Sequence, residues 1–296
     1  MASRKIVLKE FLSPSSIHKL QALFQGKLPE PKSSSGLQSQ SFVELAQHFV
    51  YLNSASSETN LDSDGYETIY APYGKPLRYK HRLWLHGVLK FHAPLRLFQE
   101  AECHEIVHTK PISQKKRQVS MAEDYDPTLN PLPTQVLVER KIYDQQQNLC
   151  LEEDRTLYYT NKDYLTDENR ITSKYPSKKS WSFTPTEIMV FRYSSLMFNA
   201  HFIHWNRPYT TSVEKYPNLI IPGPLLITAM ANFFRFSYPE LSKRVRQFDY
   251  RLLAPAFVGT PIRVCTNDTA SVWLESESTK NYPTLLAKGR FSFVSA

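Results

Sequence analysis

The segment around residue 200 carries the densest group of chemically active side chains in the sequence. Asn199, His201 and His204 lie within six residues of one another, shortly before an apolar stretch. An imidazole titrates close to neutral pH and can accept or donate a proton, whereas an amide can only orient a hydroxyl group or a water molecule. The residue types and their spacing indicate acid–base chemistry at His204, with Asn199 beside it.

A buried helix is predicted directly after this segment, over residues 224–236, because that stretch is apolar on nearly every side. Gly223-Pro224 opens it and Tyr238-Pro239 closes it, and proline is common at the first helical position. The first N–H groups of a helix have no intrahelical acceptor and carry a partial positive charge. Such donors stabilise an oxygen that becomes negative during a reaction.

Other interpretations of these histidines stay open at this point. His201 and His204 are a possible metal-binding pair, but no third ligand stands at metal spacing and H-E-x-x-H is absent, so we expect no metal and no other cofactor. Either ring could simply hydrogen-bond the backbone, and for His201 we expect support of the loop. Upstream, Asp62-Ser63-Asp64-Gly65 begins like a calcium loop but does not continue as one, which predicts a turn.

The elements that must position this segment follow from capping signals and periodicity. Ser13-Pro14 starts a predicted amphipathic helix, and apolar residues spaced three and four apart predict a second helix over residues 42–50. Residues 53–76 are polar and predict a long loop. The predicted strands cover residues 83–91, 102–108, 135–143, 156–160, 247–253, 262–266, 271–276 and 287–294. This order indicates an α+β protein.

A faint internal repeat accompanies these elements. Residues 87–97 can be laid over residues 247–257, since each has a strand, then Ala-Pro, then another strand with an arginine nearby. A duplicated fold is the economical interpretation, although Ala-Pro between strands is common.

Composition narrows the class of protein. Lys and Arg total 36 and Asp and Glu total 28, so the net charge is +8, which favours anionic partners. The aromatic residues follow strand and core patterns, which argues against a nucleic-acid binder. Three cysteines without a C-x-x-C pair favour a reducing compartment. The sequence contains no stretch of about 18 apolar residues, so we predict no membrane span. Residues 1–25 fit a weak mitochondrial presequence.

The stretch Met197-Phe198-Asn199-Ala200-His201-Phe202-Ile203-His204 resembles the S-G-D-x-N-P-[LIV]-H signature of the MaoC-like hot-dog hydratases and dehydratases. With the following Arg207-Pro208-Tyr209 and Gly223-Pro224-Leu225, it is most similar to the hydroxyacyl-thioester dehydratase type 2 family, whose fungal members are mitochondrial. The resemblance covers most of residues 82–296. Asn199 replaces the carboxylate of the signature, and Pro222 stands where many relatives have histidine.

The resemblance implies a double hot-dog fold, with two antiparallel sheets that each wrap a central helix as a pseudo-dimer. We expect an N-terminal degenerate unit at residues 1–160, a linker at 161–180 and a catalytic unit at 181–296. The implied reaction is the dehydration of (R)-3-hydroxyacyl thioesters to trans-2-enoyl thioesters in mitochondrial type II fatty acid synthesis. His204 and Asn199 are the implied catalytic residues, and Gly223 and His201 the substrate-binding ones.

The expected partner is a phosphopantetheine arm on acyl-carrier protein or coenzyme A, with the basic runs at residues 115–117 and 178–179 facing its phosphate or the acidic carrier. The chain is expected to be a monomeric pseudo-dimer or a homodimer. Two alternatives remain at this stage. One is an enoyl-CoA hydratase for a short branched or dicarboxylic acyl group, which a basic residue at the end of the groove would favour. The other is a non-catalytic acyl-carrier-binding protein.

Overall fold

The strands form one antiparallel sheet in the computed structural model, which describes residues 3–29, 41–72, 79–111, 132–162, 171–173, 175–267, 270–277 and 283–294. Within these ranges the sheet has ten strands in the order β1-β3-β4-β5-β2-β7-β10-β9-β8-β6. The strands are β1 (Ser3–Phe11), β2 (His81–Phe91), β3 (Glu100–Pro111), β4 (Thr134–Tyr143), β5 (Leu149–Thr160), β6 (Lys179–Phe183), β7 (Val245–Leu252), β8 (Ile262–Thr266), β9 (Ser271–Ser276) and β10 (Thr284–Phe293). The helices are α1 (Pro14–Phe24), α2 (Glu187–Leu196), α3 (Gly223–Ser237) and α4 (Pro239–Ser242).

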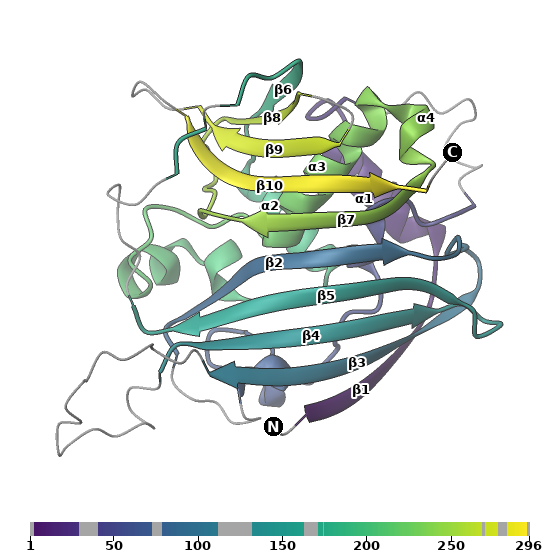
Figure 1. Cartoon of the computed structure of the whole chain (residues 1–296). Coiled ribbons are helices and arrows are strands. Elements are labelled where there is room, and N and C mark those ends of the chain that lie inside the picture. The colour runs from purple at the N-terminus through teal and green to yellow at the C-terminus, as the bar shows by residue number, and fades with distance from the viewer. Residues whose placement is uncertain are drawn as a thin grey trace.

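The two halves of the sheet have the same strand order when each is followed from its outer edge. The N-terminal half has its first, third, fourth, fifth and second strands in that order, and so does the C-terminal half. The halves join where β2 pairs with β7, from His86 opposite Arg251 to Lys90 opposite Gln247. Figure 1 shows this joint in the middle of the sheet. The predicted α+β double hot-dog is confirmed, but its two sheets are continuous.

The predicted repeat is visible in the backbone hydrogen bonds. After β2, the N–H groups of His92 and Ala93 both donate to the carbonyl oxygen of Cys150, at 2.9 and 3.4 Å. After β7, the N–H groups of Leu253 and Ala254 donate in the same way to Leu286 O, at 2.8 and 3.3 Å. Each Ala-Pro therefore marks the same turn in a duplicated fold.

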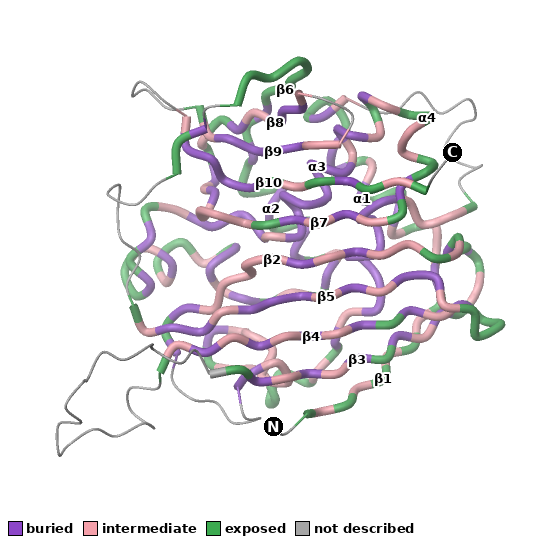
Figure 2. Tube along the Cα trace, in the orientation of Figure 1, coloured by how far each residue is buried: buried purple, intermediate pink, exposed green. Residues whose placement is uncertain are grey.

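Helix α3 is the centre of the core. Its predicted position is confirmed, and Figure 2 shows it as mostly buried behind the sheet. Phe233 and Phe234 are 1% or less exposed, and the Phe234 ring stacks on Phe291 of β10 with 3.9 Å between ring centroids. Burying each such side chain contributes about 1.5–3 kcal/mol to folding. This packing fixes the helix, and with it the position of its N-terminus, against the sheet.

The helix predicted over residues 42–50 is wrong. Phe42 forms an extended bridge with Arg96, Ala46 is left-handed with φ 60°, and only Gln47–Val50 make a 3-10 turn. The Gln47 side chain accepts the Glu44 N–H at 2.9 Å, which competes with helical hydrogen bonding. The apolar spacing buries these residues without a helix, so the N-terminal half has only a short turn where the C-terminal half has α3.

Several elements were not predicted. Strand β1 pairs with β3 along all nine residues, although this stretch resembled a presequence. Strand β6 lies partly in the expected linker, and β5 begins seven residues before the predicted strand at residue 156. Helix α2 starts after Thr186, whose side chain accepts the Met189 N–H. β1 and β6 are edge strands carrying lysine, which obscures the alternation used to recognise strands.

Helices α1, α2 and α3 lie behind the sheet in the view of Figure 1. None of the helices in the described ranges combines the length and the apolar character needed to cross a membrane. The expected unit boundaries at residues 160 and 181 stay a prediction.

Candidate active site

The chemically active segment leaves the end of α2 in a tight turn. Phe198 is left-handed, with φ 53°, and the N–H of Asn199 returns to the carbonyl oxygen of Ser194 at 2.8 Å. The Asn199 side-chain oxygen accepts the His201 N–H at 3.1 Å, and Phe202–His204 then form one 3-10 turn. These local hydrogen bonds turn the chain back toward the start of α3.

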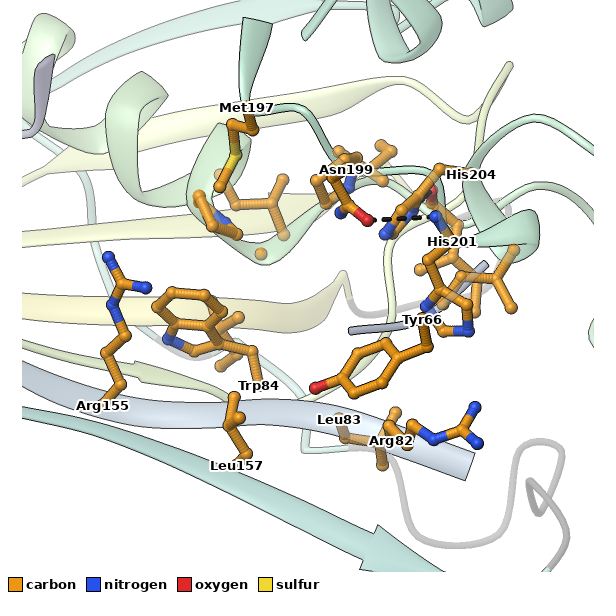
Figure 3. Close-up of a pocket in the computed structure, with 18 of the residues that line it drawn as sticks. Tyr66, Arg82, Leu83, Trp84, Arg155, Leu157, Met197, Asn199, His201 and His204 are labelled. Atoms are coloured by element: carbon orange, nitrogen blue, oxygen red, sulfur yellow. Dashed lines mark hydrogen bonds between the residues drawn. The ribbon is translucent and has the colours of Figure 1, made fainter. Parts of the chain in front are cut away.

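A single pocket receives this segment and the N-terminus of α3. Asn199, His201, His204 and Gly223 all line it, so the structure brings together the four residues expected at the site. Figure 3 shows the three side chains on one side of the pocket, with Trp84 and Arg155 farther along the wall. Both halves of the chain form the wall, and its other members include Tyr66, Tyr70, Arg82, Leu83, Leu157, Met197, Ile221, Leu226 and Leu252.

His204 is held in its neutral form. Its Nδ1 lies 2.8 Å from the carbonyl oxygen of Ile220, and because a carbonyl can only accept, Nδ1 carries the proton and Nε2 has a free lone pair. Burial, and next the nearby His201, lower the pKa of His204 to about 3, although the Ile220 carbonyl partly opposes this shift. The ring is therefore uncharged at neutral pH, with an unprotonated nitrogen at Nε2.

Gly223 is the first residue of α3, so its N–H has no intrahelical acceptor. Within the described residues no hydrogen-bond partner is seen for it, and Pro224 carries no N–H at all. A β-carbon at Gly223 would lie 2.6 Å from Cδ1 of Leu252 and 3.2 Å from Cβ of Trp84. The absence of a side chain thus lets the helix N-terminus approach β2 and β7 closely at the pocket.

Asn199 and His201 differ in their surroundings. Asn199 is half-buried, and apart from the hydrogen bond to His201 N its amide group has no partner among the described residues. His201 is 3% exposed, and its ring stands edge to face with Tyr66, at 5.0 Å, and with His204, at 5.7 Å. Asn199 can hold a hydroxyl group, while His201 packs the loop behind it.

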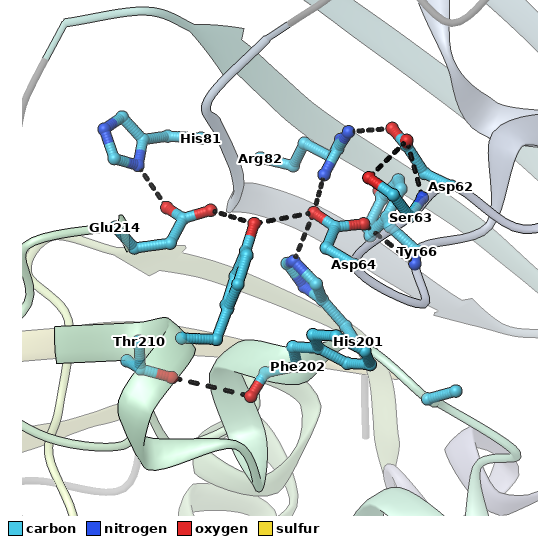
Figure 4. A network of polar contacts seen from close by, with 12 residues as sticks. Asp62, Ser63, Asp64, Tyr66, His81, Arg82, His201, Phe202, Thr210 and Glu214 are labelled. Carbon is cyan, nitrogen blue, oxygen red and sulfur yellow. Dashed lines mark hydrogen bonds and ion pairs between the residues drawn. The ribbon is translucent and has the colours of Figure 1, made fainter. Parts of the chain in front are cut away.

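A buried polar network lies behind the His201 ring and was not anticipated (Figure 4). Asp64 binds Arg82, and its Oδ2 lies 3.4 Å from Nε2 of His201. The Tyr209 hydroxyl lies 3.3 Å from Oδ2 of Asp64 and 3.1 Å from Oε1 of Glu214. The predicted turn at residues 62–65 is confirmed, but its partners are far away in the sequence, so no local pattern indicated this contact.

The network contains the one three-residue group of potential metal ligands found in the described ranges. The ligand atoms of Asp64, His201 and Glu214 lie within 4.8 Å of one another. However, the Arg82 guanidinium occupies one side of Asp64, and the Tyr209 hydroxyl lies between the two carboxylates. A cation there would have to displace these groups, so the arrangement is better suited to protons than to a metal.

The basic runs expected to face a carrier do not all bear on the pocket. Residues 115–117 lie outside the described residues. Lys179 Nζ donates to Ser237 O at 2.7 Å, at the C-terminal end of α3. A helix rises 1.5 Å per residue, which places this end about 20 Å from Gly223. Lys179 is therefore not at the pocket.

The duplicated sheet and the pocket between its halves define a double hot-dog protein. Solved structures support this fold. A MaoC-like dehydratase superposes with a TM-score of 0.63 at 12% identity, covering 99% of this chain and 98% of that one. A MaoC-like dehydratase from Phytophthora capsici gives 0.62 at 13% identity, with coverages of 99% and 95%.

The chain belongs to the hydroxyacyl-thioester dehydratase type 2 family, whose model matches residues 46–258. The mitochondrial hydroxyacyl-thioester dehydratase type 2 of Schizosaccharomyces pombe is 46% identical over 97% of this chain and 99% of that protein. The protein of the same name from Saccharomyces cerevisiae is 29% identical over 92% and 91%. A mesaconyl-C(4)-CoA hydratase of Chloroflexus aurantiacus is 29% identical over 73% and 72%. The chain is accordingly a hydro-lyase.

Proposed function

We propose that this chain dehydrates (R)-3-hydroxyacyl thioesters to trans-2-enoyl thioesters in the mitochondrion, as part of fatty acid synthesis, with His204 as the base. The observation that carries the proposal is the meeting of three groups in one pocket: an unprotonated imidazole nitrogen, a free helix N–H and an amide. Family membership supports the reaction, and the names of the two yeast relatives support the compartment.

The proposed reaction is a β-elimination. The Gly223 N–H binds the thioester carbonyl oxygen and stabilises the negative charge that develops there. His204 Nε2 removes the α-hydrogen, the carbon–oxygen bond at C3 breaks, and the electron pair of the C–H bond forms the new double bond. Asn199 orients the 3-hydroxyl group, which takes the proton from the His204 imidazolium and leaves as water. Because the pKa of His204 is lowered to about 3, the imidazolium returns its proton readily.

Replacing His204 tests this assignment directly. With 3-hydroxyacyl thioesters as substrate and enoyl absorbance as the signal, we expect His204→Ala to lose at least about 100-fold in kcat, the lower range for general acid–base catalysis. Asn199→Ala is expected to lose less, because it orients rather than transfers the proton. His104→Ala, on the exposed face of β3, is the matched control. Equal rates for wild type and His204→Ala would overturn the proposal and leave a non-catalytic binding role.

A pantetheine-linked substrate suits the pocket. Its volume is about 240 Å³, slightly below the roughly 300–1,000 Å³ of sites that enclose a whole drug-sized ligand. We infer that the acyl group enters the pocket while the carrier stays outside.

The net charge of +8 favours an acidic carrier. Comparing kcat/KM for the same acyl group on acyl-carrier protein and on coenzyme A tests which carrier the protein uses. The walls come from one chain, so a monomer suffices, which size-exclusion chromatography checks.

Arg155 bears on the dicarboxylic alternative, because it is a basic residue on the pocket wall. Its Nε and Nη2 both donate to Glu153, at 2.5 and 2.9 Å, and its guanidinium lies 4.9 Å from the Trp84 ring centroid. A guanidinium already paired in this way offers little to a distal carboxylate. We therefore propose a monocarboxylic acyl group, and graded enoyl thioesters compared with a dicarboxylic one test this choice.

A further inference from the structure

The carboxylate that the signature carries at position 199 is absent here, but another carboxylate reaches the same turn from the N-terminal half. Oδ2 of Asp64 lies 3.4 Å from Nε2 of His201, and the side chains are 5% and 4% exposed. This nitrogen forms no hydrogen bond within the described residues, and the Asp64 carboxylate contacts it at ion-pair distance. Among the described residues, Asp64 is therefore placed to orient the far edge of the His201 ring through this contact.

The turn at residues 62–65 is packed directly on the active-site segment. The Asp64 carbonyl oxygen accepts the Phe202 N–H at 2.8 Å, and Gly65 is left-handed with φ 76°. A β-carbon on Gly65 would lie only 2.3 Å from the carbonyl oxygen of Ala200. This close approach is possible only for glycine, and it sets the Asp64 side chain against His201.

Asp64 is kept ionised where it lies. Burial alone would raise the pKa of its carboxyl group, but His201 and Arg82 outweigh burial and hold that pKa well below its ordinary value. The Tyr66 N–H also donates to it, at 3.1 Å. Arg82 shares its guanidinium between Asp64 and Asp62, whose carboxylates bind its two terminal nitrogens. The negative charge next to His201 is thus fixed from three sides.

We propose that Asp64 is a positioning residue of the active site: it holds the His201 ring and through His201 keeps His204 free to act as a base. The proposal rests on the proposed function. The His201 ring faces the His204 ring across 5.7 Å between ring centroids. This neighbour is, after burial, the second cause that lowers the pKa of His204, so the orientation of His201 bears on the unprotonated state of His204.

The groups that face this pair come from several elements. His204 belongs to the same turn as His201, and Arg82 is the second residue of β2. The remaining groups come from the loop before β2 and from residues 209–214. They are Tyr66, Asp62, Tyr209 and Glu214. Removing the charge of Asp64 leaves Arg82 and the tyrosines in place, so the effect should reach His204 through His201 alone.

Asp64→Asn and Asp62→Asn form a matched pair, because both carboxylates bind Arg82 but only Asp64 reaches His201. We expect Asp64→Asn to lower kcat by about 10- to 100-fold with little change in KM, by analogy with partners that orient a metal-bound histidine. The acidic limb of its kcat/KM profile should move to higher pH. Asp62→Asn should stay within about twofold and keep the profile. Equal losses in both variants would overturn the proposal, because they would show a purely structural turn.

A double-mutant cycle with His201→Gln separates coupling from independent effects. If Asp64 acts through His201, adding Asp64→Asn to His201→Gln should change kcat by no more than about twofold, and additive losses would contradict the proposal. Thermal unfolding accompanies each variant. If Asp64→Asn does not stay folded, the pH profile of His201→Gln carries the test, since the same upward shift is expected. A wild-type pH profile in His201→Gln would refute the positioning role of Asp64. If His204→Ala is inactive but Asp64→Asn is unaffected, the positioning role fails while the proposed function stands.

Glu67 is the rival carboxylate, because it also lines the pocket. Its Oε2 accepts the hydroxyl groups of Ser54 and Ser56, at 3.2 and 2.7 Å. We expect Glu67→Gln to leave the acidic limb of the pH profile unchanged. A shift in Glu67→Gln equal to that in Asp64→Asn would assign the role to the general charge of the loop and overturn the specific one.

Discussion

The buried, neutral state of His204 makes folding stability depend on pH in a way that one substitution can isolate. The pKa of this ring is lowered from 6.5 to about 3 in the folded protein. Between these values the unfolded chain binds one more proton than the folded chain at this site, so stability falls as the pH falls below 6.5. Applied to pH 7 and pH 5, this linkage predicts that acidification costs about 2 kcal/mol through His204 alone.

His204→Asn tests this magnitude, because the asparagine amide can still donate to the Ile220 carbonyl while the titrating ring is removed. We measure the free energy of unfolding in urea at pH 7 and at pH 5. The loss of free energy of unfolding between these pH values should be about 2 kcal/mol smaller in the variant than in the wild type. Other buried groups, including His48, whose pKa is lowered mainly by burial, are present in both proteins and cancel. Parallel stability changes in both proteins would refute the assignment of a buried, neutral His204.

Three further expectations concern the backbone and the buried charges. Gly223→Ala should lower kcat about 10- to 100-fold and the free energy of unfolding by about 1–3 kcal/mol, because a new β-carbon displaces the helix N-terminus. Unchanged kinetics would show that the Gly223 N–H does not bind the thioester carbonyl. Gly65→Ala should reduce both stability and kcat. Gly259 is the control, because it is also left-handed, with φ 79°, but nothing lies within 4 Å of an added β-carbon. Gly259→Ala should lower the free energy of unfolding by only about 1–2 kcal/mol and leave activity unchanged. If both alanine variants have the same activity, the contact of Gly65 with the active-site turn does not matter. Arg140→Met should cost about 3–5 kcal/mol in urea unfolding, because it leaves two fully buried carboxylates without this partner; a stability within 1 kcal/mol of wild type would show that the buried charges are not ionised as a network.

Local patterns were sufficient to predict helix α3. Helix α3 is apolar on nearly all sides, so its type and position follow from side chains a few residues apart. The same spacing failed over residues 42–50, because the apolar side chains there are buried by an extended bridge and a left-handed Ala46. Periodicity reports which residues are buried, but the tertiary partners decide the backbone that buries them.

The amino-acid sequence by itself indicated helix α3 and the order of most strands along the chain, since these depend on neighbours close in sequence. The duplicated fold and the expected site residues followed from the internal repeat and from the resemblance to a known family. Only the tertiary structure decided the protonation state of His204, because burial and the Ile220 carbonyl set it. It likewise decided that Asp64 meets His201 across the two halves. Burial and long-range charge depend on which distant segments pack together, and no local spacing encodes that.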